Sequence, residues 1–167
     1  MNLKDTKGFT LIELIMIIVV LSIAIPPLLL YFIQGVRDSS DAQLLTQSIF
    51  LAQDIIEEAK SKKWDENSPV PPGNYSTSLG SDGETRITYD DMDDYNNLNI
   101  TPPQDSQGNP ISGFNNFTQA ATVCYVANTD LNTCIGGQSN YKKISVTVSA
   151  AGTNGPQAEI VTVMANY

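Results

Sequence analysis

The sequence predicts an α+β protein, with one long N-terminal helix packed on a C-terminal antiparallel sheet. Residues 14–33 are a run of 20 residues without a formal charge, nearly all of them apolar. Residues 37–64 carry apolar residues at spacings of three and four, which is the period of a helix. The end of the chain contains three short segments in which β-branched residues are frequent. A helix followed by neighbouring strands is typical of an α+β fold.

The apolar run is long enough to cross a membrane. A helix of about 20 residues spans roughly 30 Å, the thickness of a bilayer core. The run is also longer than the apolar part of an ordinary secretory signal. Small residues in the segment Ser22-Ile23-Ala24 do offer a cleavage site before Ile25. A retained membrane anchor explains the length of the run better.

The formal charge of the chain changes at the end of this run. Residues 1–37 carry a net charge of +1, and the rest of the chain carries −10. Basic residues before a membrane helix favour a cytoplasmic N-terminus, which places the acidic domain on the other side. An acidic domain repels phosphate groups, so no nucleic-acid partner is expected. The basic residues at 60–63 are interpreted as the end of a helix, where cations complement the helix dipole.

The chain has two cysteines, Cys124 and Cys134, and no histidine. On the far side of an inner membrane the compartment is oxidising, so a short-loop disulfide is expected, with two unrelated buried thiols as the alternative. Closing this loop contributes about 2–3 kcal/mol on the chain-entropy model. Two thiols alone make a poor zinc site. The sequence lacks a nucleophile elbow, a Ser-x-x-Lys motif and a glycine-rich phosphate loop, so no enzyme is expected.

One carboxylate, that of Glu13, stands near the start of the apolar run. A charge in a membrane segment costs about 3 kcal/mol or more, which implies a partner. The simpler alternative is a side chain that reaches the lipid headgroups from the helix end. Its neighbours favour the first interpretation. Residues 8–14, Gly-Phe-Thr-Leu-Ile-Glu-Leu after a short basic leader, resemble the type III signal of type IV pilins and type II secretion pseudopilins.

This resemblance implies that a prepilin peptidase cleaves after Gly8 and that the new amino group of Phe9 is N-methylated. Gly8 has no side chain, so a protease can approach its backbone closely. Glu13 becomes the fifth residue of the mature chain, and the resemblance implies that it pairs with the Phe9 amine of a neighbouring subunit. In a low-dielectric filament core such a pair neutralises both charges and sets the axial register.

The resemblance also divides the chain into four expected segments. Pro26 and Pro27 lie in the transmembrane part, where a kink or a locally melted stretch is expected near residues 22–27. The segments are a leader at residues 1–8, a transmembrane and assembly helix at 9–34, an amphipathic half-helix at 35–64, and a soluble domain with a variable loop and a sheet at 65–167.

The amphipathic half-helix is predicted to pack on the sheet through one apolar stripe. The stripe consists of Leu45, Ile49, Ala52, Ile56 and Ala59. Charged and amide side chains occupy the other faces of this helix.

A loop and a sheet are predicted after the helix. Residues 67–118 are rich in Pro, Gly, Asn, Asp and Ser, and 84–89 is a candidate for a short strand within them. The main predicted strands are residues 121–126, 143–148 and 159–164. Turn residues at 153–156 predict a hairpin between the last two of these strands.

Four carboxylates lie within five residues at Asp90, Asp91, Asp93 and Asp94. Oxygen-rich loops hold calcium, and some of the pseudopilins that the chain resembles bind it. The spacing is not that of an EF-hand, and no glycine lies inside the run. A solvent-exposed acidic loop without a metal is therefore the first interpretation, and a calcium site is the second. No other cofactor is expected.

Four short segments extend the resemblance to the soluble part: residues 64–68, 89–95, 143–148 and 165–167. In these the chain is similar to the D-type minor pilins of the mannose-sensitive haemagglutinin pilus. This implies a subunit that helps prime a filament, with other pilins and minor pilins, prepilin peptidase and the inner-membrane assembly platform as partners. It implies a single-pass inner-membrane protein with a periplasmic C-terminal domain, which later reaches the pilus or cell surface.

Three alternatives to a minor pilin fit the sequence. A type II secretion pseudopilin has the same N-terminal signal. An adhesin or ligand-binding module displayed on the filament is another alternative, although scattered aromatic residues more often pack in a core or a loop. The aromatic residues available for such contacts are Tyr75, Tyr89, Tyr95, Phe114, Phe117 and Tyr125. The last alternative is a signal-anchored enzyme with a mature chain that begins at Ile25.

Overall fold

The computed structural model describes residues 8–66, 71, 74–153 and 157–166. The chain separates into two units, residues 1–42 and 43–167. One helix of 51 residues, α1 (Leu11–Ser61), contributes to both units. The long helix that the sequence predicts is therefore confirmed.

The N-terminal unit consists of the first part of α1. The helix is continuous through Pro26 and Pro27, so a locally melted stretch at residues 22–27 is wrong, whereas the alternative of a kink there stays a prediction. Each proline removes one backbone donor, but its φ of about −65° is itself helical. Two prolines in a row therefore weaken the hydrogen bonding of the helix without ending it.

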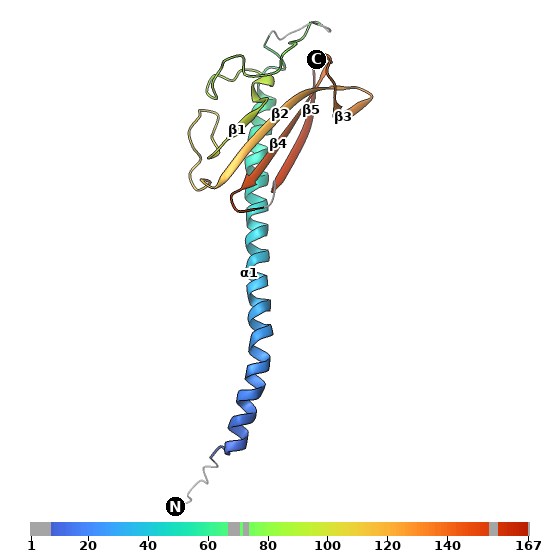
Figure 1. The fold of residues 1–167 in the computed structure, drawn as a ribbon. Coiled ribbons are helices and arrows are strands. Elements are labelled where there is room, and N and C mark those ends of the chain that lie inside the picture. Colours follow the sequence, from blue (N-terminus) through green and yellow to red (C-terminus); the bar gives the residue numbers. More distant parts are fainter. Residues whose placement is uncertain (1–7, 67–70, 72–73, 154–156, 167) are drawn as a thin grey trace, which may run out of the picture. The chain divides into compact units, whose positions relative to one another are not determined.

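The second unit contains the last part of α1 and an antiparallel sheet (Figure 1). The strands follow the order β1-β2-β4-β5, and β3 pairs with the end of β2. A short 3-10 helix, η1, precedes the sheet. The elements among the described residues are η1 (Asp93–Tyr95), β1 (Leu98–Ile100), β2 (Phe117–Ala127), β3 (Asp130–Cys134), β4 (Tyr141–Ala150) and β5 (Ala158–Ala165).

The α+β fold class and the three main strands are confirmed, and each strand is longer than predicted. Strands β4 and β5 form the predicted hairpin, with Val146 opposite Ile160. Its predicted turn lies partly outside the described residues, at positions 154–156. The short strand predicted at residues 84–89 is wrong, because this segment forms a turn in which the Thr88 N–H donates to the Thr85 carbonyl.

Two strands were not predicted. Strand β1 has only three residues, and all five residues of β3 are exposed, so neither shows the alternation that marks a half-buried strand. Both segments form strands because each of them pairs with β2.

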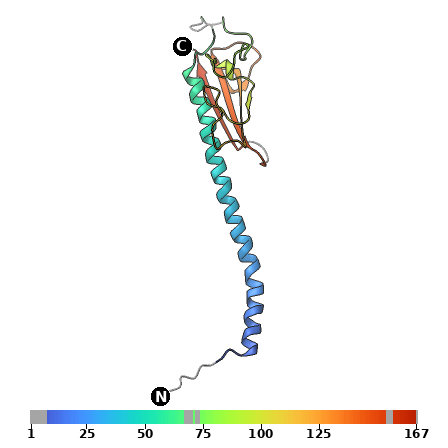
Figure 2. The same cartoon turned by 90° about the vertical axis from the view of Figure 1, so that its left-hand side faces the viewer.

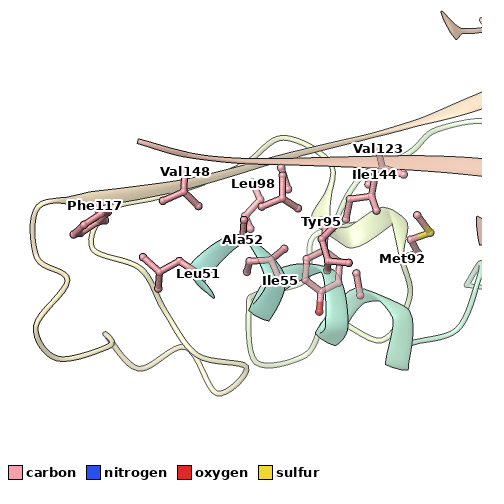
Figure 3. Packing of buried hydrophobic residues seen from close by; sticks show 14 of the residues in the cluster. Leu51, Ala52, Ile55, Met92, Tyr95, Leu98, Phe117, Val123, Ile144 and Val148 are labelled. Atoms are coloured by element: carbon pink, nitrogen blue, oxygen red, sulfur yellow. The ribbon is translucent and has the colours of Figure 1, made fainter. Parts of the chain in front are cut away.

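The core lies between the last part of α1 and one face of the sheet (Figure 2). Leu51 and Ile55 of the helix point toward sheet residues such as Val148 and Ile144 (Figure 3). Alternate positions along β4 are buried, as expected for a sheet with one covered face.

The apolar stripe predicted for the helix is partly wrong. Ala52, Ile56 and Ala59 are buried as predicted, but Leu45 is 45% exposed and Ile49 is 37% exposed. Leu51 and Ile55 take their places in the core. Apolar residues are frequent on more than one face of this helix, so its periodicity alone does not select the face that meets the sheet.

Candidate functional site

Gly8, Phe9 and Thr10 precede α1, and Thr10 caps its first turn. The N–H of Glu13 donates to Thr10 Oγ1 at 3.4 Å and to the Thr10 carbonyl at 3.1 Å. The N–H of Leu14 donates to the same carbonyl at 3.2 Å. An N-cap threonine satisfies donors that the start of a helix leaves unpaired. The helix therefore begins two residues after the predicted mature N-terminus.

Thr10 was not singled out by the sequence analysis, although the sequence contains its signal. Thr10 and Glu13 have the spacing of a capping box, in which Ser or Thr is followed three residues later by Glu or Gln. The motif that predicts processing thus also encodes the start of the helix.

Glu13 lies in the first turn of α1, where a carboxylate complements the positive end of the helix dipole. Its side chain is exposed. Within residues 8–66 and the other described parts of the chain, Glu13 forms no salt bridge. The partner expected from the sequence is therefore not among the described residues.

Gly8 stands in open surroundings. A Cβ placed on it meets no atom within 4 Å, and Phe9 next to it is 81% exposed. The described fold therefore makes no steric demand for glycine at this position.

The first part of α1 is long and apolar enough to cross a membrane. The large apolar side chains from Leu11 to Val36 are exposed. A helix that is apolar on all faces needs lipid or other helices around it. This is the property expected of a membrane anchor.

The acidic run at residues 90–94 belongs to the second unit, and the prediction of a solvent-exposed loop is wrong for three of its aspartates. Asp91, Asp93 and Asp94 are buried. Asp91 Oδ1 accepts the N–H groups of Asp93 at 2.8 Å and Asp94 at 3.2 Å. Asp94 Oδ2 accepts the N–H groups of Asp90 at 2.9 Å and Asp91 at 3.0 Å. The two carboxylates hold the turn that opens η1.

Asp93 contacts a fully buried lysine, Lys142 of β4. The ammonium Nζ donates to Asp93 Oδ1 at 2.5 Å, to the Trp64 carbonyl at 2.7 Å and to Asp65 Oδ2 at 3.2 Å. Both aspartates are buried as well. One cation therefore joins the segment after α1, the helix η1 and the strand β4.

This buried ion cluster was missed by the sequence analysis. The sequence does contain a signal for it. Every second residue of β4 faces the core, and the position two residues before Ile144 on this face is Lys142. The residues on this face are Lys142, Ile144, Val146 and Val148, and all four are buried. A charged residue on a core face requires a buried partner.

The surroundings shift several pKa values in this segment. Burial raises the pKa of the Asp91 carboxyl to about 8, and the neighbouring charges of Asp93 and Asp94 add to the effect. Burial also raises the pKa of Asp93, although Lys142 opposes the change. In contrast, a hydrogen bond from Lys63, with Nζ 2.6 Å from Oδ2, lowers the pKa of Asp90.

Carboxylate oxygens of Glu84, Asp90 and Asp94 lie within 4.8 Å of one another. Two of these residues are among the predicted calcium ligands, and calcium prefers oxygen ligands of this kind. Calcium binding stays a prediction. It is tested by the midpoint of thermal unfolding in excess calcium and in excess chelator, and equal midpoints contradict it.

Cys124 and Cys134 form the predicted disulfide, which joins β2 to β3. The aromatic residues considered for ligand contacts lie in or against the core. Tyr75, Tyr95, Phe117 and Tyr125 are buried, and Tyr89 and Phe114 are half-buried against the core.

Comparison with known proteins bears on the N-terminus alone. Residues 3–25 match the family model of the prokaryotic N-terminal methylation motif, a range that includes Gly8, Phe9 and Glu13. No curated protein and no solved structure matches the chain. The motif fits the superfamily of type IV pilins and pseudopilins and implies processing by prepilin peptidase. The helix packed on an antiparallel sheet is a type IV pilin-like architecture.

Proposed function

We propose that this chain, a type IV pilin-like protein with a prepilin methylation motif, is a minor pilin that helps prime a filament. One observation carries the proposal: the methylation motif leads directly into an exposed apolar helix. The first feature provides for processing and the second for packing in membrane and filament. The subunit acts as a structural component and not as an enzyme.

Processing and assembly use adjacent parts of the motif. Cleavage after Gly8 leaves the amine of Phe9 next to the start of the capped helix. Glu13, one turn into that helix, pairs with the Phe9 amine of a neighbouring subunit. An unpaired charge in apolar surroundings costs several kcal/mol, so the pair forms once the helices pack together. The spacing between the two groups then sets the axial offset between subunits.

The proposed topology places the N-terminus in the cytoplasm and the second unit in the periplasm. The basic leader supports this orientation, and the disulfide fits an oxidising compartment. The partners in this topology are prepilin peptidase, the inner-membrane assembly platform, and other pilins and minor pilins.

Two features support a minor role. The anchor contains the pair Pro26-Pro27, and the soluble part resembles D-type minor pilins. In a strain that lacks this chain, filament number is expected to fall while the major subunit remains abundant in the membrane. Sheared filaments are expected to contain far less of this chain than of the major subunit. Equal amounts indicate a major subunit, and a secretion defect without loss of pili indicates a pseudopilin.

Processing is tested by replacing Gly8→Leu. The larger side chain is expected to block cleavage and leave the leader attached, whereas the wild type gives a mature chain that begins with methylated Phe9. Gly35→Ala is a matched control, because a Cβ at that glycine also meets no atom within 4 Å. Mass spectrometry of the N-terminal peptide reads the outcome. A mature wild-type chain that begins at Ile25 contradicts the proposal.

Assembly is tested by replacing Glu13→Ala. This variant is expected to be cleaved and inserted normally but to enter filaments poorly, because the neighbouring amine loses its partner. Glu57→Ala removes an exposed glutamate from the second unit and serves as the control. The amount of each variant in sheared filaments is compared with the amount in the membrane. Normal incorporation of Glu13→Ala rules out the pairing.

A further inference from the structure

The surroundings of the Lys142 amine combine three features. The side chain is fully buried, two carboxylates lie within hydrogen-bond distance of Nζ, and aromatic rings cover it. Nζ lies 4.2 Å from the centroid of the Trp64 ring and 5.6 Å from that of Tyr125. Water is therefore excluded from an amine that touches two carboxyl groups.

The two carboxylates differ in their other contacts. Asp65 Oδ1 accepts the Ser76 hydroxyl at 3.0 Å, and Asp65 Oδ2 accepts the Ser76 N–H at 3.0 Å. Asp93 Oδ1 accepts Lys142, but Asp93 Oδ2 is buried without a hydrogen-bond partner among the described residues. A buried carboxylate oxygen without a partner is costly and needs an explanation. Ser76 therefore holds the Asp65 carboxylate in place.

We propose that Lys142 and Asp93 condense into an intramolecular amide bond, with Asp65 as the proton acceptor. Asp65 takes one proton from the ammonium, and the free amine of Lys142 attacks the Asp93 carboxyl carbon. The new N–C bond replaces the bond from that carbon to Oδ2. Oδ2 leaves as water with the proton held by Asp65 and a second proton from the nitrogen. One amide N–H remains, Asp65 is again a carboxylate, and no oxidant or other reactant is needed.

Burial and orientation favour this reaction. The ammonium and one carboxylate become a neutral amide, and the Asp65 carboxylate that remains keeps the hydrogen bonds that it accepts from Ser76. Well-oriented reactants within one molecule reach effective concentrations of roughly 10⁵–10⁸ M, which favours condensation that does not occur between free groups in water.

Two other ion pairs in the chain show why the proposal is restricted to Lys142. Lys63 and Asp90 are 2.6 Å apart but exposed, so water stabilises both charges. Arg86 and Glu58 are largely buried, but a guanidinium stays protonated and is a poor nucleophile. Among the described residues, only Lys142 has a primary amine that is fully buried and also contacts a carboxylate.

The bond would brace the second unit. It ties η1 to β4, two elements that lie 49 residues apart in sequence. The proposal does not rest on the filament function, because it concerns only the interior of the second unit. Its failure would leave the processing and assembly experiments unaffected.

The test is peptide mapping of the full chain in detergent after reduction and alkylation. Trypsin cleaves after Lys and Arg, so an unlinked chain gives residues 87–142, which contain both reacting residues. A linked Lys142 is not a trypsin site, so the linked chain gives residues 87–143, lighter than the sequence mass by one water. This peptide is the expected result. Recovery of residues 87–142 alone overturns the proposal, and a link that attaches residues 64–86 overturns the assignment to Asp93.

Four variants define the chemistry. Lys142→Arg keeps the charge and is expected to abolish the link, whereas Lys143→Arg on the other face of β4 is expected to leave it intact. Asp93→Asn is expected to give the same linked peptide, because ammonia leaves in place of water. Asp65→Asn removes the base and is expected to slow linking by roughly 100-fold or more, measured after pulse synthesis. Linking of Asp65→Asn at the wild-type rate contradicts a role for Asp65, and circular dichroism verifies folding.

Discussion

Lys142 shows how one buried residue determines which segments of the second unit meet. Its partners follow the end of α1 at Asp65 and lie in η1 at Asp93. A buried ion pair often adds little net stability relative to apolar residues of the same size, but removing one partner costs about 3–5 kcal/mol. The cluster therefore disfavours every arrangement that leaves one of these charges buried alone.

A second single residue, Asp91, is expected to make the stability of the folded state depend on pH. Its folded pKa of about 8 lies above the ordinary carboxyl value of about 3.9. The folded state thus retains a proton that the unfolded state loses, and the stability from this group declines as pH rises from about 4 to about 8. Asp91→Asn is neutral throughout, and its amide oxygen can accept the same two N–H groups. The variant is expected to be as stable as the wild type near pH 4 and more stable at pH 8.

Urea unfolding at both pH values measures this difference. Each unit by which the folded pKa exceeds the unfolded one corresponds to about 1.4 kcal/mol at high pH. Asp54→Asn, at an exposed helix position, controls for the loss of one negative charge. If the Asp91→Asn variant is less stable than the wild type at pH 8, the predicted rise in the pKa of Asp91 is contradicted.

At the scale of elements, the last part of α1 stabilises the second unit through one face only. Leu51 and Ile55 are in the core, whereas their neighbour Phe50 is 64% exposed. Leu51→Ala is expected to lower the free energy of unfolding by about 2–5 kcal/mol, because it removes buried methyl groups and leaves a cavity. Phe50→Ala is expected to change it by less than about 0.5 kcal/mol. Chemical denaturation compares the two, and equal losses contradict the assigned helix face.

The disulfide is the second feature at this scale. It ties β3, whose five residues are all exposed, to β2. Replacing both cysteines by serine is expected to cost about 2–3 kcal/mol, because the unfolded chain regains the entropy of the closed loop. The wild type measured with and without reductant should show the same difference. No change in the unfolding midpoint on reduction refutes this contribution.

For the whole molecule, the two units are suited to different surroundings. Residues 1–42 include a helix segment whose apolar side chains are exposed, whereas the second unit has its own core. A fragment of residues 43–167 is therefore expected to be soluble without detergent and to unfold cooperatively, while the full chain stays with the membrane fraction after alkaline extraction. The fragment is followed by circular dichroism during heating. Aggregation or a gradual transition indicates that the first unit is needed for folding.

The sequence alone determined those features that depend on neighbouring residues. The processing motif, the helix of α1, the three main strands and their hairpin all follow from spacing, local charge or turn residues over short stretches. The sequence also predicted the bond between the two cysteines, with two unrelated thiols as the alternative, and the structure confirms the bond. The spacing of apolar residues and the chemistry of neighbouring residues encode these features, so they can be predicted before any contact between distant segments is known.

Only the tertiary structure decided which helix face meets the sheet, that Asp91, Asp93 and Asp94 are buried, and what Lys142 contacts. Lys142 lies 77 residues from Asp65 and 49 from Asp93 in sequence. A local pattern identifies a residue as charged, and charge by itself favours an exposed position. Burial becomes favourable only when a distant segment brings the opposite charge, and that information lies in the packing of the whole second unit.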